Sequence, residues 1–202
     1  KHVFKKKDIS IVIFSLLYAL MSYNIVYSMC LMWLDGVIWL PVILIGVEKI
    51  IKDGRFTLFT VSLALMFMSN YYISYPVGLF TFIYFLYRSF NTDNFGIKAF
   101  IKKSFVFAGG VLLSAACSAW LLVPAFFDLM QGKIGGSNYK PDFIINFDFH
   151  DILSKLFVGS YDSITNNGLP SIFCGILIIL LLGFYLASGE IRLKEKISSI
   201  IV

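Results

Sequence analysis

The sequence predicts an all-α protein built from several membrane-spanning helices. Hydrophobic residues make up 58% of its 202 residues and charged residues only 14%, and the mean hydropathy is +0.82. Soluble domains contain about 45–50% apolar and about 25% charged residues. Here apolar stretches alternate with short charged clusters, which is typical of a polytopic membrane protein rather than of a single anchor.

The first predicted span covers about residues 9–34 and follows a cluster of lysines. At about 1.5 Å per residue it is long enough to cross about 30 Å of hydrocarbon. Asp35 and Gly36 are expected to interrupt the helix. Asp35 has two interpretations: it is the N-cap of a helix that starts near Gly36, or it is a functional acid at the outer mouth of a cavity. In the second case it would act as a base or bind a sugar hydroxyl or a cation.

Three shorter spans are expected at about 37–51, 56–69 and 75–88. Their apolar cores of roughly 11–13 residues are short for a full crossing. Either flanking polar and aromatic residues extend these helices, or the helices form short hairpins that stop below the outer surface and leave a cavity. A cavity of this kind would be lined by Asp35 and by the turn after residue 69, because non-helical backbone is tolerated there.

Two further spans are predicted at about 104–123 and 171–188, with a long polar loop between them at 124–170. Glycine and asparagine residues in the loop indicate turns. Residues 147–153 have the pattern of a short amphipathic helix with a capped start. His150 has acids beside it, but neighbouring ligands on one helix diverge, so solvated polar residues are expected there rather than a metal site.

The basic residues predict how the chain is oriented. Fourteen of the 17 lysines and arginines lie in clusters on one side of the predicted spans, and only Lys133, Lys140 and Lys155 lie on the other. The positive-inside rule then makes the basic loops cytoplasmic and the loop 124–170 extracellular. Because the net charge of +5 is distributed in this way, it does not indicate a nucleic-acid partner.

The stretch Ser69-Asn70-Tyr71-Tyr72-Ile73-Ser74-Tyr75 concentrates hydrogen-bonding side chains and flat rings at one predicted turn. Sugar-binding sites use such rings for stacking and amides for binding hydroxyl groups. A tyrosine-rich turn is equally typical of the aromatic belt at a membrane interface, and Trp33 has the same alternative role. The sequence contains no glycine-rich phosphate loop and no zinc-ligand spacing.

Three stretches resemble the YfhO family of bacterial integral membrane proteins: "SLLYALMSYNIVYSMCLMWLDGVIWLPVILIGVEKII", "SLALMFMSNYYISYPVGLFTFIYFLY" and "LFVGSYDSITNNGLPSIFCGIL". The resemblance covers most of the chain, and Trp33-Leu34-Asp35, Ser69-Asn70-Tyr71-Tyr72 and Gly159-Ser160-Tyr161 are among its most specific parts. The chain starts at Lys1 and ends within an apolar run, so we expect it to be an internal piece of a longer protein.

The resemblance implies a GT-C-type fold, a helical bundle whose active site opens to the outer face of the bacterial cell membrane. It implies a glycosyltransferase that moves a sugar from a polyprenyl-phosphate carrier to a cell-surface polymer such as lipoteichoic acid. In GT-C enzymes the catalytic acid lies in the first external loop, which would precede Lys1, so no catalytic residue is assigned. The phosphate would need an arginine or a divalent metal, and the cofactor stays open.

The expected substrate-binding residues are those of the predicted outer mouth together with the start of the last matching stretch: Trp33, Asp35, Asn70, Tyr71, Tyr72, Tyr161 and Asp162. The role expected for Asp35 is to position a hydroxyl group, with the base upstream. Two alternatives stand beside the enzyme. One is a transporter or flippase of a lipid-linked sugar, and the other is a non-catalytic protein of envelope assembly.

Overall fold

The computed structural model describes residues 9–92, 96–130, 155–157, 175–189 and 191–201. All regular elements in these ranges are helices, which confirms the predicted all-α class. The chain forms two compact units: a first unit of residues 1–34 with 143–197, and a second unit of residues 35–142 with 198–202.

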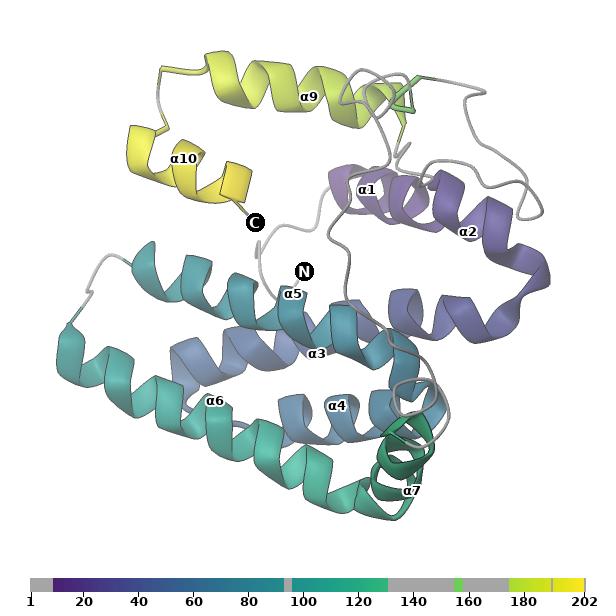
Figure 1. Ribbon diagram of the computed structural model, residues 1–202. Helices are drawn as coiled ribbons and strands as arrows, with labels where there is room; N and C mark the ends of the chain where they lie inside the picture. The colour runs from purple at the N-terminus through teal and green to yellow at the C-terminus, as the bar shows by residue number, and fades with distance from the viewer. Residues whose placement is uncertain (1–8, 93–95, 131–154, 158–174, 190, 202) are drawn as a thin grey trace. The chain divides into compact units, whose positions relative to one another are not determined.

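Figure 1 shows the described helices. In chain order they are α1 (Ile9–Ala19), α2 (Ser22–Val26), the 3-10 helix η1 (Tyr27–Met29), α3 (Leu31–Asp53), α4 (Thr57–Ser69), α5 (Tyr71–Phe90), α6 (Ile97–Cys117), α7 (Ala119–Leu129), α9 (Ile176–Ala187) and α10 (Leu193–Ile201).

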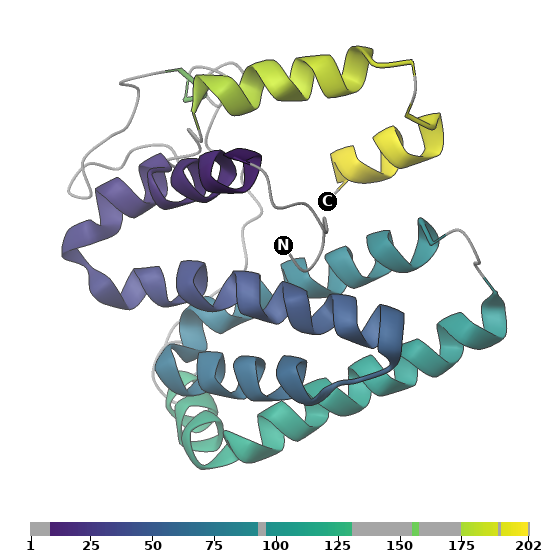
Figure 2. The same cartoon turned by 180° about the vertical axis from the view of Figure 1, so that it is seen from behind.

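In the second unit, two glycines of α3 leave room for neighbouring helices. A Cβ atom on Gly46 would lie 2.6 Å from the Cα atom of Phe59, which belongs to the backbone of α4. Figure 2 shows α3 alongside α4. A Cβ atom on Gly36 would lie 2.6 Å from Cγ2 of Ile73 on α5. A side chain at Gly46 would therefore meet the backbone of α4, whereas one at Gly36 would require the Ile73 methyl group to move.

Helix α6 packs on α4 through a row of small residues. Gly110, Ser114 and Ser118 are spaced by four and share one face of the helix. The Ser114 hydroxyl donates a hydrogen bond to the Thr60 carbonyl at 2.9 Å, and the Ser118 hydroxyl donates to the Ala64 carbonyl at 3.1 Å. Small residues of this kind allow membrane helices to pack closely, and their hydroxyl groups bond across the interface.

Stacked phenylalanines form the core where α4, α5 and α6 meet. The ring of Phe107 on α6 lies 4.9 Å from the ring of Phe59 on α4 and 4.5 Å from the ring of Phe85 on α5, measured between centroids. All three side chains are buried. This cluster fixes the first half of α6 against the end of α5.

In the first unit, α1 and the segment α2–η1 are bent by 45° relative to each other. The Asn24 amide donates hydrogen bonds to the carbonyls of Tyr18 and Ala19 at 3.0 and 3.1 Å. These carbonyls belong to the last turn of α1, whose groups have no partners within the helix. A polar side chain inside an apolar run therefore supports the end of α1 at the bend.

The expected helix break at Asp35 and Gly36 is wrong. Helix α3 runs through both residues, and the chain instead leaves helical structure around residue 20 and at Cys30. Gly36 lies inside the helix, and Cγ2 of Ile73 occupies the space next to it that a side chain would need. The interpretation of Asp35 as an N-cap is therefore excluded.

Two of the three short spans are longer than expected. Helix α3 has 23 residues and α5 has 20, compared with the predicted spans 37–51 and 75–88. Flanking polar and aromatic residues extend them, which was one of the two alternatives. Helix α4 has 13 residues and agrees closely with the predicted span 56–69.

The bounds of the later helices also differ from those predicted. Helix α6 begins at Ile97 and not at residue 104, because Lys98 and Lys102 project from the exposed side of its first turns. Residues 124–129, expected in the loop 124–170, belong to α7. Helix α9 lies within the predicted span 171–188. The predicted helix at 147–153 lies outside the described residues.

Among the described residues, α6 alone is long and apolar enough to cross a membrane by itself. The bent pair of α1 with α2–η1 would add a second span if it crosses as one unit, and α4, α7 and α9 are shorter apolar helices. The larger number of crossings expected from the sequence stays a prediction.

We expect Gly46→Ala to lower the free energy of unfolding by about 1–3 kcal/mol, because its methyl group would meet the backbone of α4. Gly109→Ala is the matched control, since no atom lies within 4 Å of a Cβ atom at that position. Denaturant unfolding of the purified full-length variants in detergent measures the difference. Equal stability of the two variants would contradict the close packing of α3 on α4.

Candidate functional site

One end of the second unit brings together four of the seven residues predicted to form an external site. The Trp39 indole on α3 donates a hydrogen bond to the Ser69 hydroxyl at the end of α4, at 3.2 Å. Gly36 faces Ile73 in the first turn of α5. The two contacts place Asp35, Asn70, Tyr71 and Tyr72 around the same end of the unit, which we call the tyrosine end.

Asn70 has a clear structural role at the tyrosine end. It is the N-cap of α5, and its side-chain oxygen accepts hydrogen bonds from the backbone N–H groups of Tyr72 and Ile73, both at 3.1 Å. These groups belong to the helix start, where N–H groups have no partner within the helix. Asn70 was predicted to be a substrate ligand, and its capping role was not predicted.

Tyrosine rings surround the start of α5. Tyr71, Tyr72 and Tyr75 are 42%, 63% and 78% exposed. They lie in the first turns of the helix and not in the irregular turn that the sequence suggested. Exposed rings at a helix end can stack on a sugar or lie at the membrane interface.

Asp35 is half-buried and is the fifth residue of α3. It forms no hydrogen bond or ion pair with another residue in the described part of the chain. A carboxylate without a protein partner can accept hydrogen bonds from a hydroxyl group or bind a cation. The expected role of Asp35 in binding a substrate stays a prediction.

Trp33 belongs to the first unit and is part of an aromatic cluster. Its ring stacks on the Tyr27 ring at 5.6 Å, and Tyr27 in turn contacts the Tyr23 ring at 4.7 Å, between centroids. The Tyr23 hydroxyl donates to the Trp33 carbonyl at 3.1 Å. The cluster connects α2 and η1 to the start of α3. The remaining predicted ligands, Tyr161 and Asp162, lie outside the described residues.

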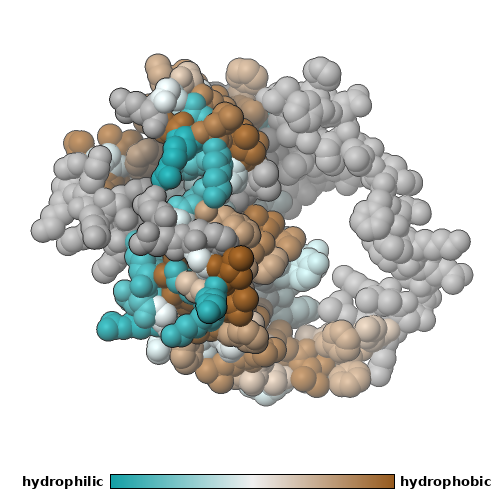
Figure 3. All heavy atoms as spheres, turned by 90° about the vertical axis from the view of Figure 1, so that its left-hand side faces the viewer, coloured by the Kyte–Doolittle hydropathy of each residue, from teal (hydrophilic) through white to brown (hydrophobic). Residues whose placement is uncertain are grey.

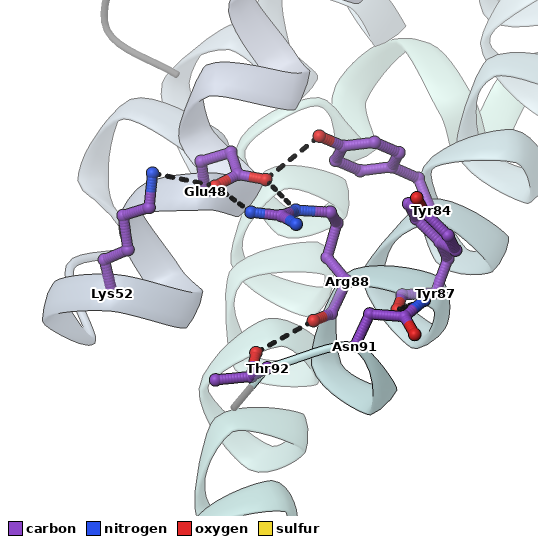
Figure 4. Close-up of polar contacts among 7 residues, drawn as sticks. All are labelled: Glu48, Lys52, Tyr84, Tyr87, Arg88, Asn91 and Thr92. Carbon is purple, nitrogen blue, oxygen red and sulfur yellow. Dashed lines mark hydrogen bonds and ion pairs between the residues drawn. The ribbon is translucent and has the colours of Figure 1, made fainter. Parts of the chain in front are cut away.

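At the opposite end of the second unit, Glu48 forms a polar cluster that the sequence analysis missed. Glu48 is only 3% exposed. Its Oε1 atom accepts hydrogen bonds from Arg88 Nε and from the Tyr84 hydroxyl, the latter at 3.0 Å. Its Oε2 atom accepts from Arg88 Nη2 and forms an ion pair with Lys52 Nζ, both at 3.1 Å. Figure 4 shows Glu48 and Lys52 on α3 facing Tyr84 and Arg88 on α5.

The Glu48 cluster connects two parallel helices. Gly36 faces Ile73 at one end of α3 and α5, and Glu48 binds Arg88 toward the other. Both carboxylate oxygens are occupied, so Glu48 holds the helices together and is not placed to act as a base. Val47 and Ile50, its neighbours in the sequence, are also buried, but no local pattern indicates that a glutamate is buried there. The predicted span 37–51 includes Glu48 but gave it no role.

Metal ligation finds no support in the described residues. They contain no group of three or more His, Cys, Asp or Glu side chains that could hold a metal ion. The tyrosine end contributes one carboxylate, Asp35. A metal bound there would need ligands from elsewhere in the protein.

Comparison with known protein families shows to which family the chain belongs. The family described as "Bacterial membrane protein YfhO" matches residues 1–202. The chain belongs to this family. The YfhO description and the apolar helix α6 place the protein in a bacterial membrane.

A curated relative of the same name is similar to part of the chain. It is "Uncharacterized protein YfhO" of Bacillus subtilis (strain 168), which is 28% identical over 122 residues. The match covers 60% of this chain and 14% of the relative, so the chain corresponds to a small part of that protein. No solved structure matches this YfhO chain.

Replacing Glu48 should separate α3 from α5. We expect Glu48→Ala to lower the free energy of unfolding by about 2 kcal/mol or more, because Arg88 would lose its carboxylate partner in a half-buried position. Asp53→Ala is the matched control, since Asp53 is exposed at the end of the same helix. Its effect should stay within about 0.5 kcal/mol. Denaturant unfolding of both full-length variants in detergent tests this, and similar losses in the two would contradict it.

Proposed function

We propose that this YfhO chain is part of a membrane glycosyltransferase that transfers a sugar from a polyprenyl-phosphate carrier to a cell-surface polymer such as lipoteichoic acid. The observation that carries the proposal is that Asp35 and the exposed Tyr71 and Tyr72 lie at the same end of the second unit. Family membership supports a role in the bacterial envelope. The GT-C-type fold and the outward orientation of the tyrosine end belong to the same proposal.

The residue types at the tyrosine end suit the binding of a sugar. Aromatic rings offer flat apolar faces for stacking, with a polar hydroxyl at the rim. A carboxylate accepts hydrogen bonds from sugar hydroxyl groups. Asp35 supplies the carboxylate, and Tyr71 and Tyr72 supply the rings. Asn70 contributes indirectly, because it starts α5 at the point where both tyrosines are presented.

In the proposed reaction, the acceptor hydroxyl attacks the anomeric carbon of the carrier-linked sugar. The bond from this carbon to the phosphate oxygen breaks, and the hydroxyl proton passes to a base. Asp35 positions a hydroxyl group, and a residue not assigned here acts as the base. The departing phosphate requires positive charge. All basic residues in the described part of the second unit lie at the opposite end, so this charge comes from elsewhere or from a divalent metal.

Asp35→Asn in the full-length protein should reduce sugar transfer by about tenfold or more while leaving membrane insertion intact, since asparagine keeps the size of the side chain but loses its charge. The sugar content of surface polymers, determined by mass spectrometry, is compared in cells that lack the gene and in cells complemented with wild type or variant. Full rescue by Asp35→Asn would exclude Asp35 from the site. An unchanged polymer in the deletion strain would favour the transporter or the assembly protein.

Asn70 variants separate capping from ligand binding in the same assay. Asn70→Ala removes the cap and should reduce both transfer and stability, the latter by about 1 kcal/mol. Asn70→Ser keeps a capping oxygen and should retain most of the transfer. Loss of transfer in Asn70→Ser with normal stability would instead make the Asn70 amide a direct ligand.

A further inference from the structure

The end of the second unit opposite to the tyrosine end carries an excess of positive charge, and we call it the basic end. It includes the C-terminal parts of α3 and α5 and the N-terminal part of α6. All seven basic residues in the described part of the second unit lie here: Lys49, Lys52, Arg55, Arg88, Lys98, Lys102 and Lys103. The described acids at this end are Glu48, which is already paired, and Asp53. Figure 3 shows hydrophilic side chains gathered on this side, with hydrophobic ones beside them.

Within the basic end, the first turns of α6 present an apolar row. Ile97, Ile101 and Phe105 are spaced by four residues, so they lie along one side of the helix. They are 69%, 48% and 76% exposed. The side of α6 that packs on α4 and α5 is a different one and carries Phe107 and Gly110. The apolar row therefore does not face the described helices α4 and α5 of the second unit.

A basic row runs beside the apolar row. Lys98 and Lys102 each follow a member of the apolar row by one residue, and both are exposed. Neither forms a hydrogen bond or ion pair with another described residue. Stacking of Phe100 on Phe85 at 6.3 Å and on Phe90 at 5.3 Å fixes this part of α6 against α5. The two rows are thus held in place as a pair.

We propose that the two rows bind an anionic phospholipid, with an acyl chain along Ile97, Ile101 and Phe105 and the phosphate at Lys98 and Lys102. The charge of the basic end complements a negative headgroup, and the apolar row extends from it as an acyl chain does. Lysine side chains place their ammonium groups at the level of lipid phosphates while their methylene groups lie along apolar surface. The inference goes beyond the proposed function, because lipid binding requires no sugar transfer.

Native mass spectrometry of the full-length protein in detergent tests the proposal. The protein is mixed with equal amounts of phosphatidylglycerol and phosphatidylcholine, and the ratio of the two bound lipids is measured. We expect wild type to retain phosphatidylglycerol preferentially. Lys98→Gln with Lys102→Gln should reduce that preference by about tenfold. An equal retention of both lipids by wild type, or an unchanged preference in the double variant, would overturn the proposal.

The matched control is Lys49→Gln with Arg55→Gln, which removes the same charge from the basic end but leaves both rows of α6 intact. It should keep at least half of the preference. An equal loss in both double variants would indicate diffuse attraction to the basic end and overturn the proposed site. Inorganic phosphate in excess should not displace phosphatidylglycerol. Displacement by it would assign Lys98 and Lys102 to a soluble anion and overturn the lipid assignment.

Discussion

The contact between α3 and α5 determines where the candidate site lies. Near one end, Gly36 lets Ile73 approach so closely that a methyl group at position 36 would displace the Ile73 side chain. Toward the other end, Glu48 is buried and bound by Arg88, Tyr84 and Lys52. A buried carboxylate is costly without partners, so the helices are favoured in the one register that supplies them. That register brings Asp35 beside the first turn of α5 and its exposed tyrosines.

The same arrangement separates the charges of the second unit. The described basic residues lie at one end, whereas Asp35 and the tyrosines lie at the other. Between the ends, serine and threonine groups bond across α4 and α6, and phenylalanines stack among α4, α5 and α6. This distribution suits a helical unit in a bilayer, because these polar groups in the middle are paired and the charged residues lie at the ends. We propose different ligands for the two ends, a sugar at one and an anionic lipid at the other.

Composition and the apolar pattern predicted a helical membrane protein, and the bacterial context came from the resemblance to the YfhO family. The apolar pattern also placed α4 almost correctly. The helix ends were harder to predict, because glycine and asparagine each have more than one role. Gly36 resembles a turn residue in sequence, and only the position of Ile73 shows that it serves close packing. Asn70 was correctly placed between two helices, yet its capping bonds depend on backbone geometry. The burial of Glu48 depends on Arg88, 40 residues away, and no local pattern indicates this pair.

The most direct test of the account is a disulfide between α3 and α5 at the tyrosine end. Gly36→Cys with Ile73→Cys is introduced into the full-length protein after its other cysteines are replaced, and crosslinking is measured in membranes. Because these positions are in contact, the pair should oxidise readily. The control is Gly36→Cys with Phe80→Cys, about two turns further along α5, combined with Ile73→Ala so that the Cγ2 methyl group is absent in both variants. It should not crosslink. Crosslinking of the second pair, or of neither, would contradict the register that places Asp35 beside the tyrosines.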